Sequence, residues 1–374
     1  MQSLAQGGYT HKQVLDQLLY SDGSRNINFR YALLNEFDVP IADSLSVSGG
    51  SVRHASLSEI KRTAMFTLKE TEFRDIDYSK ERIQPYFRLQ MTPRDWLEWS
   101  LGIFLISSPV RKEQNGHVFR ELNCDDSSVM LVEDKFTDRH LIRHGSNYVN
   151  AIRLILNSAK LQKINIESND ALTSRDIEFE IGMKKSEAVN DLLDAINYTS
   201  YHVDEAGYVT AKPYVSPSNT PAGMTYETDD LSVIAPGAEN ELDTFDIPNI
   251  FIAVATNPET DKSLKSKYTN NDPMSMLSTV RRGRNVVRFD ELSDIADQAT
   301  LDSYIQRIAF EASQVYDKVR FTTAAMPHHG YMDVLNIKHK ILGISERYSE
   351  TAWEMNLNTG SVQMTHEVRR ILTV

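Results

Sequence analysis

The chain has 374 residues, of which 41% are hydrophobic and 25% are charged, and these values are ordinary for a folded globular protein. Its 40 Lys and Arg against 52 Asp and Glu give a net charge of −12. Proteins that hold nucleic-acid phosphates usually carry the opposite sign, so the balance argues against that class. The single cysteine, Cys124, excludes an intramolecular disulfide and a cysteine-rich zinc site.

The length predicts two or three domains at about 150 residues each. A membrane helix needs ~18 uncharged apolar residues, and the longest apolar runs, 101–106 and 250–255, fall far short of that. Residues 1–10 have neither the basic residues nor the apolar core of a secretory signal. We therefore expect a soluble protein that is made in the cytoplasm.

The first third is predicted to be almost entirely β. A short amphipathic helix follows Thr10, and Gly49-Gly50 then indicates a turn. Apolar and polar residues alternate from 60 to 69, the period of a half-buried strand. Further strands are expected at 82–90, 96–106 and 117–122. Strands joined by short polar turns indicate an antiparallel sheet or a small barrel.

The middle third contains apolar residues at both the helical spacing and the strand spacing. A last strand is expected at 128–132, followed by helices at 148–159 and after Ser186. A hairpin comes next, with strands at 198–203 and 208–215. Residues 225–248 carry seven acidic side chains and no Lys or Arg, which favours a solvated connection between domains.

The last third begins with a continuous apolar run at 249–256, typical of a buried strand. A polar loop is expected at 257–273, and a helix at 301–319 whose apolar residues form one stripe. The chain then predicts strands at the following ranges: 320–326, 331–337, 341–348, 351–357 and 362–372, the last two forming a hairpin.

The usual catalytic motifs are missing from the sequence. It has no Gly-x-x-x-x-Gly-Lys-[Ser/Thr] phosphate loop, no Gly-x-Gly-x-x-Gly after a strand and no Gly-x-Ser-x-Gly elbow. Cys124 stands beside Asp125 and Asp126, whose charges raise a thiol pKa and so oppose a reactive thiolate.

Metal ligands of the right type occur near the C-terminus: His328, His329 and His339, with Asp333 between them. Neighbouring residues of an extended chain point to opposite faces, which opposes one ion shared by His328 and His329. A structural turn after Pro327 is the favoured interpretation.

Two acidic pairs, Asp125-Asp126 and Asp229-Asp230, lack the spacing of a calcium loop and are interpreted as solvated turns or strand ends.

Two surface interpretations remain open. Trp96 and Trp99, near Tyr86 and Phe87, could stack on sugars, although core packing is the favoured interpretation. The basic run 281–284 could meet phosphates or an acidic partner, although a solvated loop is favoured. The sequence therefore assigns no catalytic, cofactor-binding or metal-binding residue, and we expect a protein that is neither an enzyme nor cofactor-dependent.

A characteristic order of segments runs through most of the chain: 48–52 with 60–64, 122–126 leading to 145–156, 204–209, 248–249, 271–275, the helix expected at 301–319, and 330–335. This order, from about residue 26 to residue 372, resembles the baseplate hub or tail-tip hub proteins of tailed bacteriophages, including the N-terminal portion of tail-associated lysins.

The resemblance implies an α+β, multidomain fold with two antiparallel β-barrel-like, tail-tube-like modules around a mixed α/β region. The expected domains are 1–123 (helix and first module), 124–247 (mixed region with the acidic connection) and 248–374 (second module with one long helix). It also implies a structural homotrimer whose six modules form a pseudo-hexameric ring in the virion tail.

As implied by the family, the ring joins a six-fold tail tube or distal tail protein to a three-fold spike or tail fibre. DNA or the tape-measure protein passes through the lumen without specific binding, and an acidic wall suits that passage. No membrane insertion by this chain is expected. Two alternatives stay open: a tail-associated peptidoglycan hydrolase, and a host carbohydrate-binding tail module.

Overall fold

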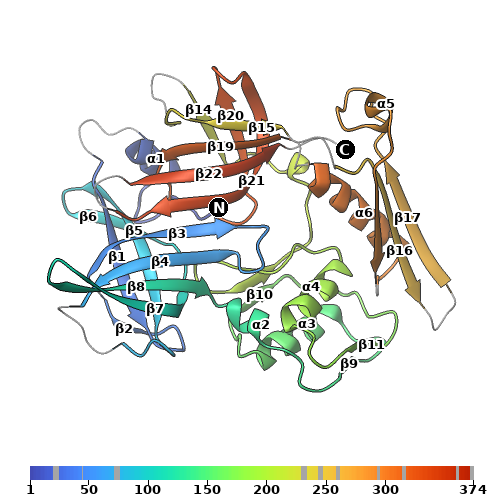
Figure 1. Ribbon diagram of the computed structural model, residues 1–374, viewed down its shortest axis with the longest axis horizontal. Helices are drawn as coiled ribbons and strands as arrows, with labels where there is room; N and C mark the ends of the chain where they lie inside the picture. Colours follow the sequence, from blue (N-terminus) through green and yellow to red (C-terminus); the bar gives the residue numbers. More distant parts are fainter. Residues whose placement is uncertain are drawn as a thin grey trace.

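The computed structural model describes residues 1–19, 25–43, 45–70, 76–228, 234–242, 247–257, 262–292, 295–313, 317–358 and 362–370. One sheet of 14 strands dominates the molecule, and two smaller units with helices lie beside it (Figure 1). Most strand pairs are antiparallel, so the α+β class is confirmed. Within the described ranges this sheet does not close on itself, and the two barrel-like modules are not confirmed.

The first β region, residues 25–126, forms one half of the large sheet, and helix α1 (His11–Leu19) packs beside it. Its strands are β1 (Ile27–Leu34), β2 (Pro40–Ala42), β3 (Val47–Ala55), β4 (Arg62–Lys69), β5 (Arg82–Thr92), β6 (Asp95–Ser100), β7 (Phe104–Gln114) and β8 (His117–Asp126).

The second β region forms the other half of the sheet and is assembled from two separate stretches of chain. Its strands are β14 (Met224–Glu227), β15 (Glu239–Leu242), β19 (Asp317–Ala324), β20 (Val334–His339), β21 (Ile344–Asn356) and β22 (Gln363–Arg370).

Strands β3 and β21 join the two halves. They pair antiparallel from Ala55 opposite Ala352 to Ser51 opposite Asn356, so the order β22-β21-β3-β4 runs across the junction. One hydrophobic core fills both halves, with Phe66 and Phe104 from the first region and Phe321 from the second. The two β regions therefore share a sheet and a core.

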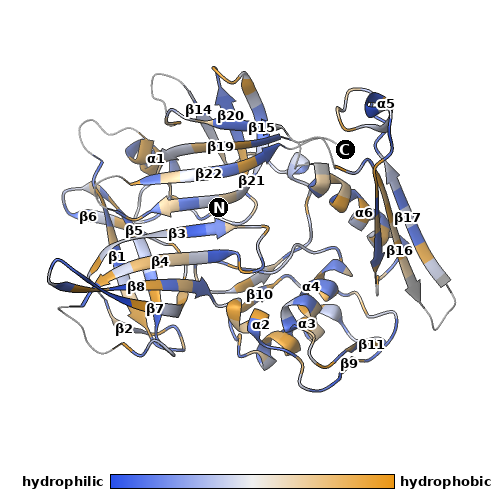
Figure 2. Cartoon of the chain, in the orientation of Figure 1, coloured by the Kyte–Doolittle hydropathy of each residue, from blue (hydrophilic) through white to orange (hydrophobic). Residues whose placement is uncertain are grey.

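The middle region, residues 127–219, packs helices against short strands around a core of its own. Hydrophobic residues gather on its helices (Figure 2). Helix α3 starts at Asn147, whose side chain accepts a hydrogen bond from the Asn150 backbone N–H and so caps it. The elements are α2 (Val129–Glu133), β9 (His140–Ile142), α3 (Tyr148–Ser158), β10 (Ile164–Ile166), β11 (Ile177–Phe179), α4 (Lys185–Asp194), β12 (His202–Val203), β13 (Val209–Ala211) and η2 (Pro217–Asn219).

A fourth unit, here called the inserted unit, lies between β15 and β19 in the sequence. It has a separate three-stranded sheet in the order β17-β16-β18 and a separate core. Its elements are β16 (Ile250–Asn257), β17 (Lys262–Thr269), α5 (Thr279–Arg282), β18 (Val287–Leu292) and α6 (Gln298–Ser313). The domain boundaries expected at 123 and 247 remain a prediction.

Two glycines explain where the strand predictions for the first β region were wrong. The single strand expected at 96–106 is broken between β6 and β7, because Gly102 has φ +131° and a Cβ there would lie 2.7 Å from the Arg62 side chain. Gly49-Gly50 is part of β3 and not a turn. A Cβ on Gly50 would collide with the Met65 carbonyl of β4, so glycine permits the close approach of the two strands.

The segment 128–132 forms helix α2 where a strand was expected. The Asp126 carboxylate accepts the Ser128 backbone N–H at 2.8 Å, which turns the chain at the end of β8. The acidic segment 225–248, expected as a connection, contributes β14 and β15 to the large sheet. The expected polar loop 257–273 contains β17, and the expected strands 341–348 and 351–357 are one strand, β21.

The junction between the β regions depends on Trp353 of β21. Its side chain is 3% exposed, and its ring stacks on His54 of β3 with centroids 5.8 Å apart. We expect Trp353→Ala to lower the free energy of unfolding by about 3–5 kcal/mol through the cavity it leaves, measured by urea unfolding. Trp96→Ala, at a half-buried position on β6, is the control and should cost much less.

No helix in the described ranges is long and apolar enough to cross a membrane.

Candidate functional site

The connection between β19 and β20 holds the histidines that the sequence analysis considered as metal ligands. His328 and His329 are each 1% exposed, and their ring centroids lie 4.6 Å apart. His329 joins a buried cluster, whereas His339 lies at the far end of β20 and accepts the Leu342 backbone N–H. The three histidines therefore do not converge on one point.

The buried cluster is built around Glu350 of β21, whose carboxylate lies between two histidines. One oxygen lies 2.5 Å from His329 Nδ1 and the other lies 2.6 Å from His366 Nδ1. The outer nitrogens meet hydroxyls: His329 Nε2 lies 2.7 Å from Tyr226 Oη, and His366 Nε2 lies 2.8 Å from Thr323 Oγ1. Strands β14, β19, β21 and β22 and one loop thus converge on it.

The carboxylate fixes one proton on each ring. A carboxylate only accepts, so both imidazoles carry Nδ1–H and donate it to Glu350. The Nε2 atoms lie within hydrogen-bond distance of the Tyr226 and Thr323 hydroxyls, and the Thr323 hydroxyl also donates to the Ala324 carbonyl. Burial alone would raise the pKa of Glu350, but the two imidazoles outweigh burial and lower it to about 2. Burial lowers the pKa of His366, against the pull of Glu350.

The residue types His329, Glu350 and His366 match a zinc or iron site, and one ligand atom from each lies within 4.8 Å of the others. Their spacing is that of hydrogen bonds, since two ligands of one tetrahedral zinc lie about 3.3 Å apart. All four ring nitrogens also have a partner in the network. Hydrogen bonds therefore explain the arrangement of these residues, and the cluster fixes four strands relative to one another.

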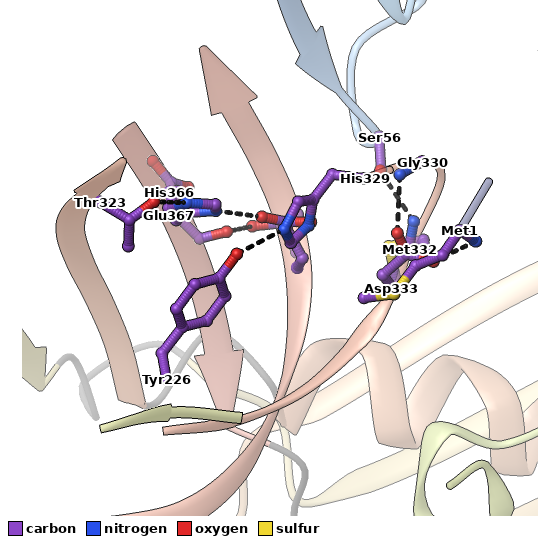
Figure 3. Close-up of polar contacts among 12 residues, drawn as sticks. Met1, Ser56, Tyr226, Thr323, His329, Gly330, Met332, Asp333, His366 and Glu367 are labelled. Atoms are coloured by element: carbon purple, nitrogen blue, oxygen red, sulfur yellow. Dashed lines mark hydrogen bonds and ion pairs between the residues drawn. The ribbon is translucent and has the colours of Figure 1, made fainter. Parts of the chain in front are cut away.

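The first residues of the chain bind beside the cluster. The Met1 ammonium pairs with Asp333 at 3.0 Å, and Asp333 also accepts the Gly330 backbone N–H at 2.6 Å (Figure 3). Gln2 donates its amide to the carbonyls of Ser100 in the first β region and Pro327 in the second. The N-terminal residues therefore connect the two β regions.

A cavity of about 870 Å³ opens where the N-terminus, the first β region, the middle region and the inserted unit meet. Its wall includes Arg62, a 2% exposed guanidinium that donates to the Leu101 carbonyl at 2.7 Å. Arg307 also lines it and pairs with Asp194 at 2.6 Å. The wall contains more acidic than basic side chains, which does not favour an anionic ligand.

The other residues that the sequence analysis considered as functional candidates occupy structural positions in the fold. Trp99 is 3% exposed and donates Nε1–H to the Ser3 carbonyl, so it belongs to the core rather than to a sugar-binding surface. Asp126 is 1% exposed and accepts the Arg62 backbone N–H, whereas Asp229 and Asp230 lie outside the described residues. Arg281 and Arg282 form the last turn of α5 instead of a loop.

Cys124 is 2% exposed, and burial raises the pKa of its thiol. We expect the native protein to react with a thiol-specific disulfide reagent at least about 100-fold more slowly than the urea-unfolded chain, since only an exposed thiolate attacks. Absorbance during labelling measures both rates. Fast labelling of the native protein would contradict the buried position.

Comparison with known proteins shows where this fold occurs. No family model and no curated protein sequence matches the chain. A tail protein from Neisseria meningitidis superposes with TM-score 0.66 and 12% identity over 92% of this chain and 97% of that one. The chain has the fold of a phage tail protein.

Two further structures extend this result. A 43 kDa tail protein of prophage MuSo2 from Shewanella oneidensis matches with TM-score 0.63 and 10% identity, covering 91% of this chain and 98% of that one. A type VI secretion component of E. coli, described as similar to T4 bacteriophage tail proteins, matches with TM-score 0.51 and 9% identity over 88% and 74%. The resemblance to tail hub proteins is thus confirmed in the fold.

Sequence reasoning missed Tyr226, Glu350 and His366. Only His366 lies in a strand that the sequence predicted, 362–372. Tyr226 falls in the acidic segment 225–248 that was expected as a connection, and Glu350 falls between the expected strands 341–348 and 351–357. Pairing Glu350 with His366 required the register of β21 and β22, which shifts at a bulge between Glu350 and Ala352.

Proposed function

We propose that this protein is the structural hub of a phage tail tip or baseplate. Three copies form a ring in which the two β regions of each copy serve as tail-tube-like modules, so that six modules face the six-fold tail tube. The ring joins the tube or a distal tail protein to a three-fold spike or fibre. The observation that supports this most is the match in fold to phage tail proteins over more than nine-tenths of both chains.

The junction supports the proposal physically. Because β3 and β21 pair edge to edge and share a core, the two β regions are held at a fixed angle, as one third of a rigid ring requires. The acidic chain, with a net charge of −12, suits a lumen through which DNA or a tape-measure protein passes without adhering. Assembly in the host cytoplasm and location in the virion tail belong to the same proposal.

Light scattering and electron microscopy of the purified chain test this proposal. A 42.6 kDa subunit gives a trimer of about 128 kDa, with a ring of six similar densities in class averages. A monomer at every concentration up to the millimolar range would overturn it. Clearing of bacterial cell walls in a zymogram by the chain alone would instead favour a peptidoglycan hydrolase, and binding on a glycan array would favour a carbohydrate-binding module.

A further inference from the structure

The sheet of the inserted unit has a helix on one face only. Phe251, Ala253 and Ala255 of β16 point to the inner face, where they pack against α6 in a common core. Side chains alternate along a strand, so Ile250, Ile252 and Val254 point to the opposite face. Those three are half-buried and belong to none of the hydrophobic cores of the described residues.

The strand registers show what surrounds this aliphatic column. On β18, Val287 pairs with Ile250 and Phe289 pairs with Ile252. On β17, Lys267 lies opposite Ile252 and Lys265 lies opposite Val254. Thr269 lies opposite Ile250, and Glu291 lies opposite Val254. Paired residues share a face of the sheet, so we name these nine side chains the outer face: Ile250, Ile252, Val254, Lys265, Lys267, Thr269, Val287, Phe289 and Glu291.

Large apolar side chains on the outer face are open to solvent. Val287 is 54% exposed and Phe289 is 59% exposed. The adjoining connection adds Met274, 81% exposed, and Val280, 63% exposed. Figure 1 shows α6 between this sheet and the rest of the molecule, so the outer face points away from the body. By strand register the exposed Val287 and Phe289 lie beside Ile250 and Ile252, and an exposed apolar patch of this kind marks an interaction site.

The stretch of chain that includes part of the outer face carries a charge opposite to that of the whole chain. Residues 263–288 contain six Lys or Arg and one Asp, a charge of +5, in a chain whose net charge is −12. The rest of the chain therefore carries −17. Neither Lys265 nor Lys267 takes part in an ion pair within the described residues, and both are exposed. The net negative charge of two copies opposes their association, and a basic face of one copy that meets an acidic face of the next reduces that repulsion.

We propose that the outer face is a contact between subunits, where the inserted unit of one copy binds an acidic surface of a second copy. This rests on the proposed trimer and adds the surface that holds it. An apolar centre with a charged rim fits a stable interface. Because the contact joins two different faces, it is heterologous, and such contacts close into a ring when the rotation permits.

The test compares two variants with a matched control in the full-length protein. Phe289→Asp puts a charge into the apolar centre, and the double variant Lys265→Glu/Lys267→Glu reverses the rim. Ile341→Asp is the control, since Ile341 is an apolar side chain 92% exposed between β20 and β21. All four positions are exposed, so circular dichroism and the melting temperature report whether each variant folds as the wild type does.

Light scattering over a dilution series gives the result. We expect the concentration at half-assembly to rise at least tenfold for Phe289→Asp and for the lysine double variant, with no change for Ile341→Asp. A wild-type trimer that Phe289→Asp leaves intact overturns this inference and leaves the proposed hub standing. A wild-type monomer overturns both, and a folded Ile341→Asp monomer shows a different contact surface.

Zero-length carbodiimide crosslinking of wild-type protein, followed by mass spectrometry, supplies a second readout. Mixing isotopically labelled and unlabelled subunits separates links between copies from links within one copy. Links from Lys265 or Lys267 to carboxylates of another copy support the contact. Links only within one copy, in a sample that is trimeric by light scattering, contradict the contact. Binding of Lys265 and Lys267 to DNA in place of a second copy would also contradict it.

Discussion

Replacing Glu350 with Ala should lower the free energy of unfolding by about 3–5 kcal/mol, one of the largest effects of any single substitution in this protein. The carboxylate accepts a hydrogen bond from each of two imidazoles that are fully buried. Its removal leaves two Nδ1–H groups in a dry interior without an acceptor. Urea unfolding followed by tryptophan fluorescence measures the change.

Two variants make the result specific to the cluster. Glu350→Gln keeps the shape and one acceptor, and the histidine that faces the new amide can change tautomer, so about 1–2 kcal/mol should be lost. Glu354→Ala removes an exposed carboxylate from the same strand and should change little. If Glu350→Ala were no more costly than Glu354→Ala, the cluster would not be a structural element.

The second large effect is expected from pH. Burial lowers the pKa of His54, His328 and His366, and it lowers the pKa of His202 to about 3. In the unfolded chain these imidazoles take up protons near pH 6.5, whereas in the folded chain they stay neutral. The unfolded state therefore binds more protons, and stability is present above pH 6.5 and is lost as the pH falls.

His202, whose folded pKa is about 3, should cost about 2 kcal/mol of stability at pH 5, because one pH unit below the unfolded pKa is worth about 1.36 kcal/mol. The lowered pKa values of His54, His328 and His366 add losses of the same sign. Glu350, whose folded pKa is about 2, adds a further loss as the pH falls below its unfolded value near 4.5. Urea unfolding at pH 7.5, 6.5, 5.5 and 5.0 measures the slope.

His328→Leu tests the origin of that slope. Neither ring nitrogen of His328 has a hydrogen-bond partner in the described part of the chain, so leucine removes a protonation site without breaking a bond. Between pH 6.5 and 5, the number of protons taken up on unfolding should fall by about one, so the free energy of unfolding should change less steeply with pH. An unchanged slope would mean that His328 is already accessible to protons in the folded state.

The histidine cluster shows how far residue patterns reach. A structural role for His328 and His329 in a turn follows from Pro327 and from the geometry of adjacent residues, and both side chains are buried there. Glu350, His366 and Tyr226 come from three other strands. Their convergence depends on strand pairing such as that of Tyr226 with Ile337, 111 positions apart, and single-sequence alternation gives the face of a residue without its partner.

Residue type alone also fails to predict the structure of some single elements. The sequence predicts Gly102 inside the strand 96–106 and Gly50 in a turn, yet Gly102 breaks the strand and Gly50 permits close packing of β3 against β4. The difference lies in which atoms surround each glycine. The charges of the acidic segment 225–248 predict a solvated connection. In the structure, β14 pairs with β20 and β15 pairs with β19 in the large sheet.

The sequence by itself determined the α+β class, the two β-rich ends around a mixed region, most helices, and an order of elements that resembles tail hub proteins. These follow from periodicity and turn chemistry, which are local. Only the tertiary structure decided that both β regions share one sheet and one core, that residues 247–313 form a separate unit, and that Glu350 holds two histidines. Each of these depends on which distant strands become neighbours, because the free energy of burying their faces is gained only when the partners meet.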